Sequence, residues 1–97
     1  MELTFEGPVF EWRGPSPYHF VAVPEDESDD IEDVKADFTY GWGVIPVTCT
    51  IGDVVWTTSL FPRDGVFLVP LKDEVRRRAG IGLDDVVTIH LRLGRHS

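Results

Sequence analysis

The sequence contains no asparagine and no glutamine, and its 97 residues include a single cysteine, Cys49. A single cysteine excludes an intramolecular disulfide, which is expected of a protein from a reducing compartment. Without side-chain amides, any polar site must use backbone groups, hydroxyls, carboxylates, Arg, His or Trp. The fold must therefore be held together by apolar burial and hydrogen bonds.

Long apolar runs and a basic N-terminal leader are also absent. The longest apolar stretches, such as Phe20–Val23 and Val66–Val69, are far shorter than the ~20 residues of a membrane-spanning helix. The first residues read MELTFEGP, with acids where a signal peptide needs bases and a longer apolar segment. We therefore expect a cytoplasmic protein with no membrane partner.

The negative charge is concentrated in one segment of the chain. The net charge is −8, and Pro24–Asp37 contributes −7 of it, with eight acids and only Lys35 as a base. A negative chain repels phosphate backbones, so no nucleic-acid partner is expected. We interpret the acids as the solvated faces of a helix.

Alternation of apolar and polar residues predicts most of the chain to be β-strand. Leu3 and Phe5 share one face, and the pattern changes phase at Gly7–Pro8, which predicts one long bent strand that continues to Trp12. Five further strands are expected, at Tyr18–Val23, Val44–Ile51, Val54–Phe61, Val66–Val69 and Val86–Leu93.

Two segments have helical periodicity. The first, Asp29–Phe38, follows Ser28 as the expected N-cap. The second, Leu71–Ala79, has acids in its first turn, arginines in its last turn and Gly80 directly after it. Together these elements predict a mainly β fold, a small closed or partly open six-stranded β-barrel with two short helices. We expect residues 1–97 to form a single domain, because this length suffices for one domain only.

Several short motifs resemble a known family. They are WRGPSP at Trp12–Pro17, GWGVIPV at Gly41–Val47, TSLFP at Thr58–Pro62 and PLK at Pro70–Lys72. Together, over nearly the whole chain, they resemble the bacterial domain of unknown function numbered nineteen-oh-five. The resemblance implies a small closed β-barrel with one or two helices. The family has no assigned activity, so the resemblance leaves the function open.

No catalytic or metal-binding pattern stands out. The histidine spacing fits no metal signature, and neither Ser16 nor Ser59 lies in a G-x-S-x-G motif. Cys49 lies mid-strand among inward-facing residues, which favours a buried structural role over a nucleophilic one. We therefore assign no catalytic residue, metal ligand or cofactor, and enzyme activity is not the favoured interpretation.

Aromatic and basic residues form the most promising pattern, because Trp, Tyr and Arg are enriched in binding sites. The expected ligand-binding residues are Trp12, Arg13, Tyr18, Trp42, Lys72 and Arg76. Trp56 and Phe61 would extend the cluster. Core packing uses the same residue types, and for Trp12 and Trp56 it is the favoured interpretation, since both lie within strands.

The sequence thus favours a non-enzymatic domain that binds a small anionic or aromatic ligand. The alternative is a homodimeric or protein–protein interaction module that pairs through edge strands. A DNA-binding regulator is less favoured. Gly82–Leu93 is similar to small swapped-hairpin barrels that bind DNA, and Arg76–Arg78 forms a local basic patch, but the net charge of −8 opposes this function.

Overall fold

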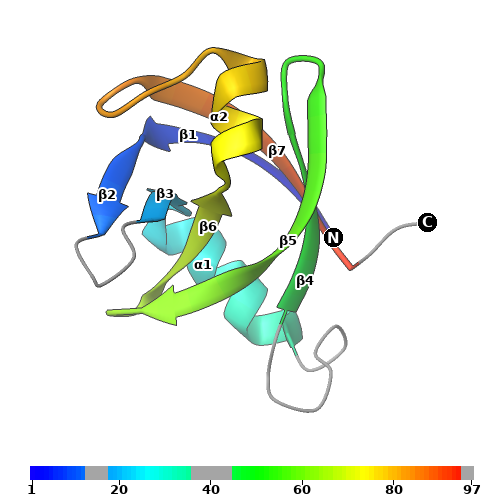
Figure 1. The fold of residues 1–97 in the computed structure, drawn as a ribbon. Coiled ribbons are helices and arrows are strands. Elements are labelled where there is room, and N and C mark those ends of the chain that lie inside the picture. Colours follow the sequence, from blue (N-terminus) through cyan, green and yellow to red (C-terminus); the bar gives the residue numbers. More distant parts are fainter. Residues whose placement is uncertain (13–17, 36–44, 95–97) are drawn as a thin grey trace.

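The computed structural model describes residues 1–12, 18–35 and 45–94, in which it has seven strands and two helices (Figure 1). In chain order they are β1 (Glu2–Pro8), β2 (Phe10–Trp12), β3 (Tyr18–Ala22), α1 (Glu25–Val34), β4 (Ile45–Ile51), β5 (Val54–Arg63), β6 (Val66–Leu71), α2 (Asp73–Ala79) and β7 (Val86–Leu93). The predicted mainly β fold with two short helices is confirmed.

The strands form one curled antiparallel sheet in the order β1-β7-β4-β5-β6-β3-β2 (Figure 1). Over the described residues the sheet is an open half-barrel of seven strands. The predicted count of six and the closed alternative are therefore wrong, and the open alternative is the one found. Its two edges are β1 and β2, which follow one another in the chain.

The additional strand arises because the expected bent strand is interrupted at Val9. The Val9 N–H donates to the carbonyl of Asp85 at 2.9 Å, and its carbonyl accepts from the N–H of Asp84 at 2.9 Å. Val9 therefore pairs with the loop before β7. On either side of it, β1 pairs with β7 and β2 pairs with β3. The phase change at Gly7–Pro8 correctly marked this bend, directly before Val9.

The main core fills the inner side of the curled sheet. In β7 every second residue is buried, as the alternation predicts: Val87, Ile89, Leu91 and Leu93. Cys49 and Trp56 lie opposite one another in β4 and β5 and are also buried. Fully burying an aliphatic side chain of this size contributes about 1.5–3 kcal/mol, so this core is the main source of stability.

Helix α1 begins earlier than the sequence predicts, because Ser28 does not cap it. Pro24 is the N-cap, where its missing N–H costs nothing. Ser28 lies inside the helix and is buried. Its hydroxyl donates to the Val23 carbonyl at 3.0 Å and accepts from the Phe67 N–H at 3.1 Å, which ties α1 to β6. Residues 36–38 of the predicted helix lie outside the described residues.

Helix α2 ends at Ala79, as predicted. It begins at Asp73, two residues later than expected, because Leu71 is the last residue of β6 and is buried in the core. Gly80 ends the helix with a left-handed φ of +69°, and its N–H faces the carbonyls of Arg76 and Arg77. In the described part of the chain, no helix has the length and apolar character needed to cross a membrane.

Candidate functional site

A second apolar surface lies on the side of β3 and β6 that faces away from the main core. Phe20 is its centre and is only 1% exposed. Around it stand the rings of Phe10, Trp12, Tyr18 and Phe61, with centroids 6.0, 6.1, 6.2 and 5.8 Å from that of Phe20. We call these five residues the aromatic face. Tilted pairs at this separation are favourable aromatic contacts.

Three rings of the aromatic face are open to solvent. Trp12 is 41% exposed, Tyr18 59% and Phe61 47%. The core position favoured for Trp12 is therefore wrong. Trp12 ends β2, a three-residue edge strand that pairs only with β3 among the described strands, so nothing described covers its ring fully. Trp56, by contrast, is 9% exposed and belongs to the core as predicted. Adjacent exposed aromatic rings are a common feature of binding surfaces.

The guanidinium of Arg63, at the end of β5, lies over the Trp12 ring. Its central carbon is 3.6 Å from the ring centroid, which is a cation–π contact. The contact joins the ends of β2 and β5, which are separated by β3 and β6 in the sheet order. It therefore holds one side of the aromatic face together.

A groove of about 730 Å³ runs along the aromatic face beneath α2. Figure 1 shows α2 at the top of the molecule, with β6 leading into it. The groove is lined by residues of β3, β5, β6 and α2: Tyr18, His19, Thr58, Phe61, Pro70, Leu71, Lys72, Asp73, Glu74 and Arg77. It thus combines two exposed aromatic rings with side chains of both charges.

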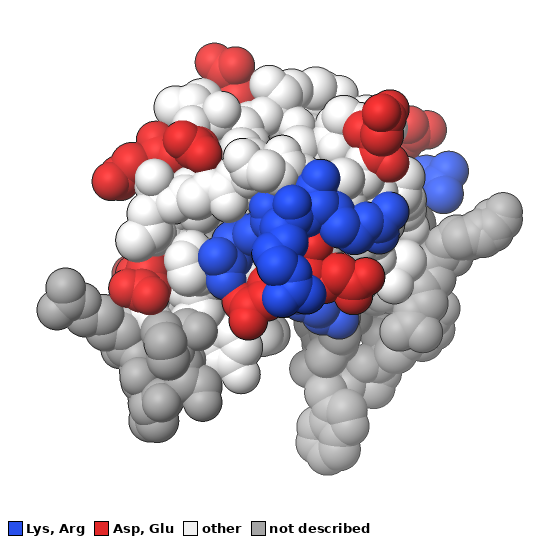
Figure 2. Space-filling view, turned by 45° about the horizontal axis from the view of Figure 1, so that its top comes forward, with Lys and Arg blue, Asp and Glu red and all other residues white. Residues whose placement is uncertain are grey.

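The unpaired charge of the groove is positive. Asp73 forms an ion pair with Arg76 within α2. Among the described residues no ion pair engages Lys72 or Arg77, so these two cations face one remaining carboxylate, Glu74. Figure 2 shows Lys and Arg side chains gathered on the face of the molecule that carries α2. The bases at α2 are Lys72, directly before the helix, and Arg76, Arg77 and Arg78 in its last turn, and we call these four residues the basic patch.

The structure brings together part of the site predicted from the sequence. Tyr18 and Lys72 line the same groove, and Trp12 joins it through the aromatic face. Arg76 does not line the groove: it pairs with Asp73, and its Nε is buried without a partner among the described residues. Arg13 and Trp42 lie outside the described residues.

Arg77, rather than Arg76, provides the second cation of the groove, and sequence reasoning missed it. The signal was present in the helical spacing. Arg77 is four residues after Asp73 and three after Glu74, so it is a neighbour of each of them on the surface of α2. All three line the groove.

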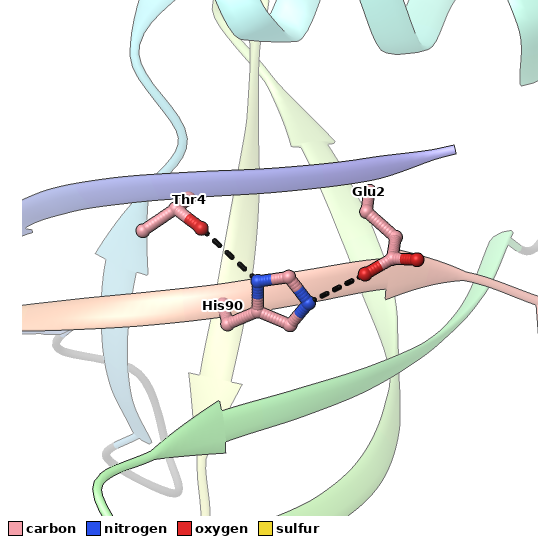
Figure 3. Close-up of polar contacts among 3 residues, drawn as sticks. All are labelled: Glu2, Thr4 and His90. Atoms are coloured by element: carbon pink, nitrogen blue, oxygen red, sulfur yellow. Dashed lines mark hydrogen bonds and ion pairs between the residues drawn. The ribbon is translucent and has the colours of Figure 1, made fainter.

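A carboxylate, an imidazole and a hydroxyl also meet on β1 and β7 (Figure 3). His90 Nε2 is 2.8 Å from Glu2 Oε1, and His90 Nδ1 is 3.0 Å from Thr4 Oγ1. This order resembles a nucleophilic triad, but the three side chains are exposed and none of them lines the groove. A triad needs oxyanion donors in a water-excluding site. We interpret the trio as a polar link that holds the edge strand β1 to β7.

Cys49 does not offer a reactive thiol. It is completely buried, and burial raises the pKa of its thiol from 9.0 to about 12. The thiolate that a nucleophile or metal ligand requires is therefore disfavoured. Within residues 1–12, 18–35 and 45–94, no three His, Cys, Asp or Glu side chains are grouped so as to hold a metal ion.

The curled antiparallel sheet, the two short helices and the groove beneath α2 define a small β-rich domain. Residues 5–91 match the model of the family described as "Domain of unknown function (DUF1905)", and the chain belongs to this family. The matched region contains every residue that lines the groove. No curated protein matches the chain.

Proposed function

We propose that the protein is a non-enzymatic binding domain whose groove takes a small, planar aromatic ligand that carries an anionic group. One observation carries the proposal: aromatic rings and unpaired cations from different elements line a single groove. Tyr18 comes from β3, Phe61 from β5, Lys72 from the junction between β6 and α2, and Arg77 from α2.

The aromatic part of the groove is pre-formed for stacking. Phe20 is buried and contacts the rings of both Tyr18 and Phe61, so their positions are supported from below. A ring that is already held in place loses little conformational entropy when a ligand binds. Such rings offer a large, rigid contact area, which favours flat apolar ligands.

The charged part of the groove favours an anion on that ligand. Lys72 presents an ammonium group with three donors, and Arg77 presents a planar guanidinium. Both belong to the basic patch at α2, so an anion in the groove meets nearby cations although the net charge of the chain is −8. An aromatic carboxylate or phosphate would satisfy the rings and the cations together.

The test is binding of 1-naphthoate, observed by saturation-transfer NMR. Phe61→Ala removes one of the two exposed rings of the groove, and we expect it to weaken binding about tenfold. Val55→Ala is the matched control, because Val55 is 55% exposed on the same strand and does not line the groove. Equal binding by the two variants would overturn the proposal.

The exposure of Trp12, Tyr18 and Phe61 also favours a second function, an interface between two copies of the chain. Light scattering distinguishes the two functions. A dimer that dissociates on Phe61→Ala substitution supports the interface. A monomer that binds 1-naphthoate supports the groove as a ligand site.

A further inference from the structure

We infer that the groove takes a phosphorylated aromatic compound of the mononucleotide class, with its phosphate on a hydroxyl-lined shelf beside Lys72. The inference rests on the proposed function and names the class of ligand for the same site. The inference is based on a second surface depression next to the groove, which is lined by hydroxyl groups and contains no carboxylate among its described lining residues.

The shelf is a depression of about 370 Å³ across β5 and β6. Its lining residues are Thr57, Thr58, Ser59, Phe61, Pro70 and Lys72. Thr57, Ser59 and Phe61 share one face of β5 because alternate residues of a strand point the same way. Four residues line both depressions, so the groove and the shelf are continuous: Thr58, Phe61, Pro70 and Lys72.

The two depressions differ in the charge that they accept. The lining residues of the shelf, all of them in the described part of the chain, include three hydroxyls and one ammonium group but no carboxylate. A phosphate monoester carries close to two negative charges and several strong acceptor oxygens, which hydroxyl and ammonium donors satisfy. Lys72 lines both depressions, and a phosphate on the shelf reaches its ammonium group while staying clear of Glu74, a groove carboxylate that no ion pair engages among the described residues. The phosphate is therefore expected on the shelf.

The groove, in turn, suits a nucleobase. Tyr18 and Phe61 supply rings for stacking, which is tolerant of base type. Glu74 can accept hydrogen bonds from the exocyclic amino group of a base, and Arg77 can donate to a ring nitrogen or carbonyl. The groove volume of about 730 Å³ is typical of small-molecule sites. A mononucleotide spans both depressions, with its sugar near Lys72.

The experiment is isothermal titration calorimetry with three probes: adenosine 5′-monophosphate, adenosine and ribose 5-phosphate. We expect the nucleotide to bind about tenfold more tightly than either of the other two, because only it occupies the groove and the shelf together. Lys72→Ala should remove most of this preference, because the phosphate then loses its ammonium partner. The double substitution Thr57→Val and Ser59→Ala should act in the same way. Lys35→Ala is the control and should change nothing, because Lys35 pairs with Glu32 at the end of α1 and lines neither depression.

The outcomes separate this inference from the proposed function. Equal binding of nucleotide and adenosine, with 1-naphthoate still bound, overturns the inference and leaves the proposed function intact. Binding of ribose 5-phosphate as tight as that of the nucleotide also overturns the inference, because the aromatic part then contributes nothing. Failure of both the nucleotide and 1-naphthoate to bind overturns the two proposals together.

Discussion

Phe20 shows how a single residue can organise a surface. It lies in a strand whose neighbouring residue, Val21, belongs to the main core, and alternation turns Phe20 to the opposite side of the sheet. There it is buried by other aromatic rings. The exposed rings of Trp12, Tyr18 and Phe61 thus rest on a buried one, which holds a largely apolar surface in a defined shape.

Ser28 is the one polar side chain that is buried among the described residues, and its substitution gives a residue-scale prediction. Ser28→Ala leaves the Val23 carbonyl and the Phe67 N–H without their partner. We expect the free energy of unfolding to fall by about 1–3 kcal/mol, as measured by urea denaturation. Ser59→Ala, on the shelf, is the control and should change stability by less than about 0.5 kcal/mol. Equal effects of the two substitutions would contradict this assignment.

Cys49 gives a prediction about pH. The thiol has a pKa near 9.0 when unfolded and about 12 when folded, because burial disfavours the thiolate. Between these values the unfolded chain loses a proton that the folded chain keeps, so stability falls as pH rises. Below the lower value the thiol contributes no pH dependence. By about pH 10.5 the free energy of unfolding has fallen by about 2 kcal/mol.

Urea denaturation of the wild type and of Cys49→Ala, at about pH 8 and about pH 10.5, measures this contribution. Every other side chain is common to the two proteins, so only the contribution of Cys49 remains in the comparison. The wild type should lose about 2 kcal/mol more than the variant over this interval. Parallel losses would show that Cys49 is not buried as described.

At the scale of elements, Gly80 is required by its conformation and Gly82 is not. Gly80 has a left-handed φ of +69° at the end of α2, whereas a Cβ at either position meets nothing within 4 Å. Gly80→Ala should therefore cost about 1 kcal/mol through backbone strain alone. Gly82→Ala should be neutral or slightly stabilising. Thermal denaturation of both variants tests this, and equal melting temperatures would contradict it.

The sequence predicts the strands well because half-buried strands alternate regularly. β7 is found at its predicted bounds, and the bend after β1 follows the phase change at Gly7–Pro8. The start of α1 could not be read in the same way. Ser28 has the chemistry of an N-cap, and only the tertiary contact with Phe67 shows that it serves as a buried link instead.

The candidate site was predictable in residue type and only partly in position. Tyr18 and Lys72 were expected and share the groove. The hydroxyls of the shelf were not expected, because Thr57 and Ser59 have no distinctive spacing of their own. They become neighbours of Lys72 only through the pairing of β5 with β6, which is a long-range feature of the sheet.

At the scale of the whole molecule, the charges are separated between the two helices. α1 carries acids along its length, and the basic patch beside the groove comprises Lys72, Arg76, Arg77 and Arg78. At ordinary salt, electrostatic interactions are largely screened beyond about 10 Å. An anion in the groove therefore interacts mainly with the cations of the groove itself. An acidic protein can therefore present a site for an anion.

The most direct test of the ligand site is a two-dimensional amide NMR titration with 1-naphthoate. We expect the largest shifts at residues that line the groove in β3, at the end of β5 and from Pro70 to Arg77. The amide resonances of α1 and of β7 should not shift. Shifts centred on those two elements, or no shifts at concentrations that saturate an aromatic site, would contradict the account.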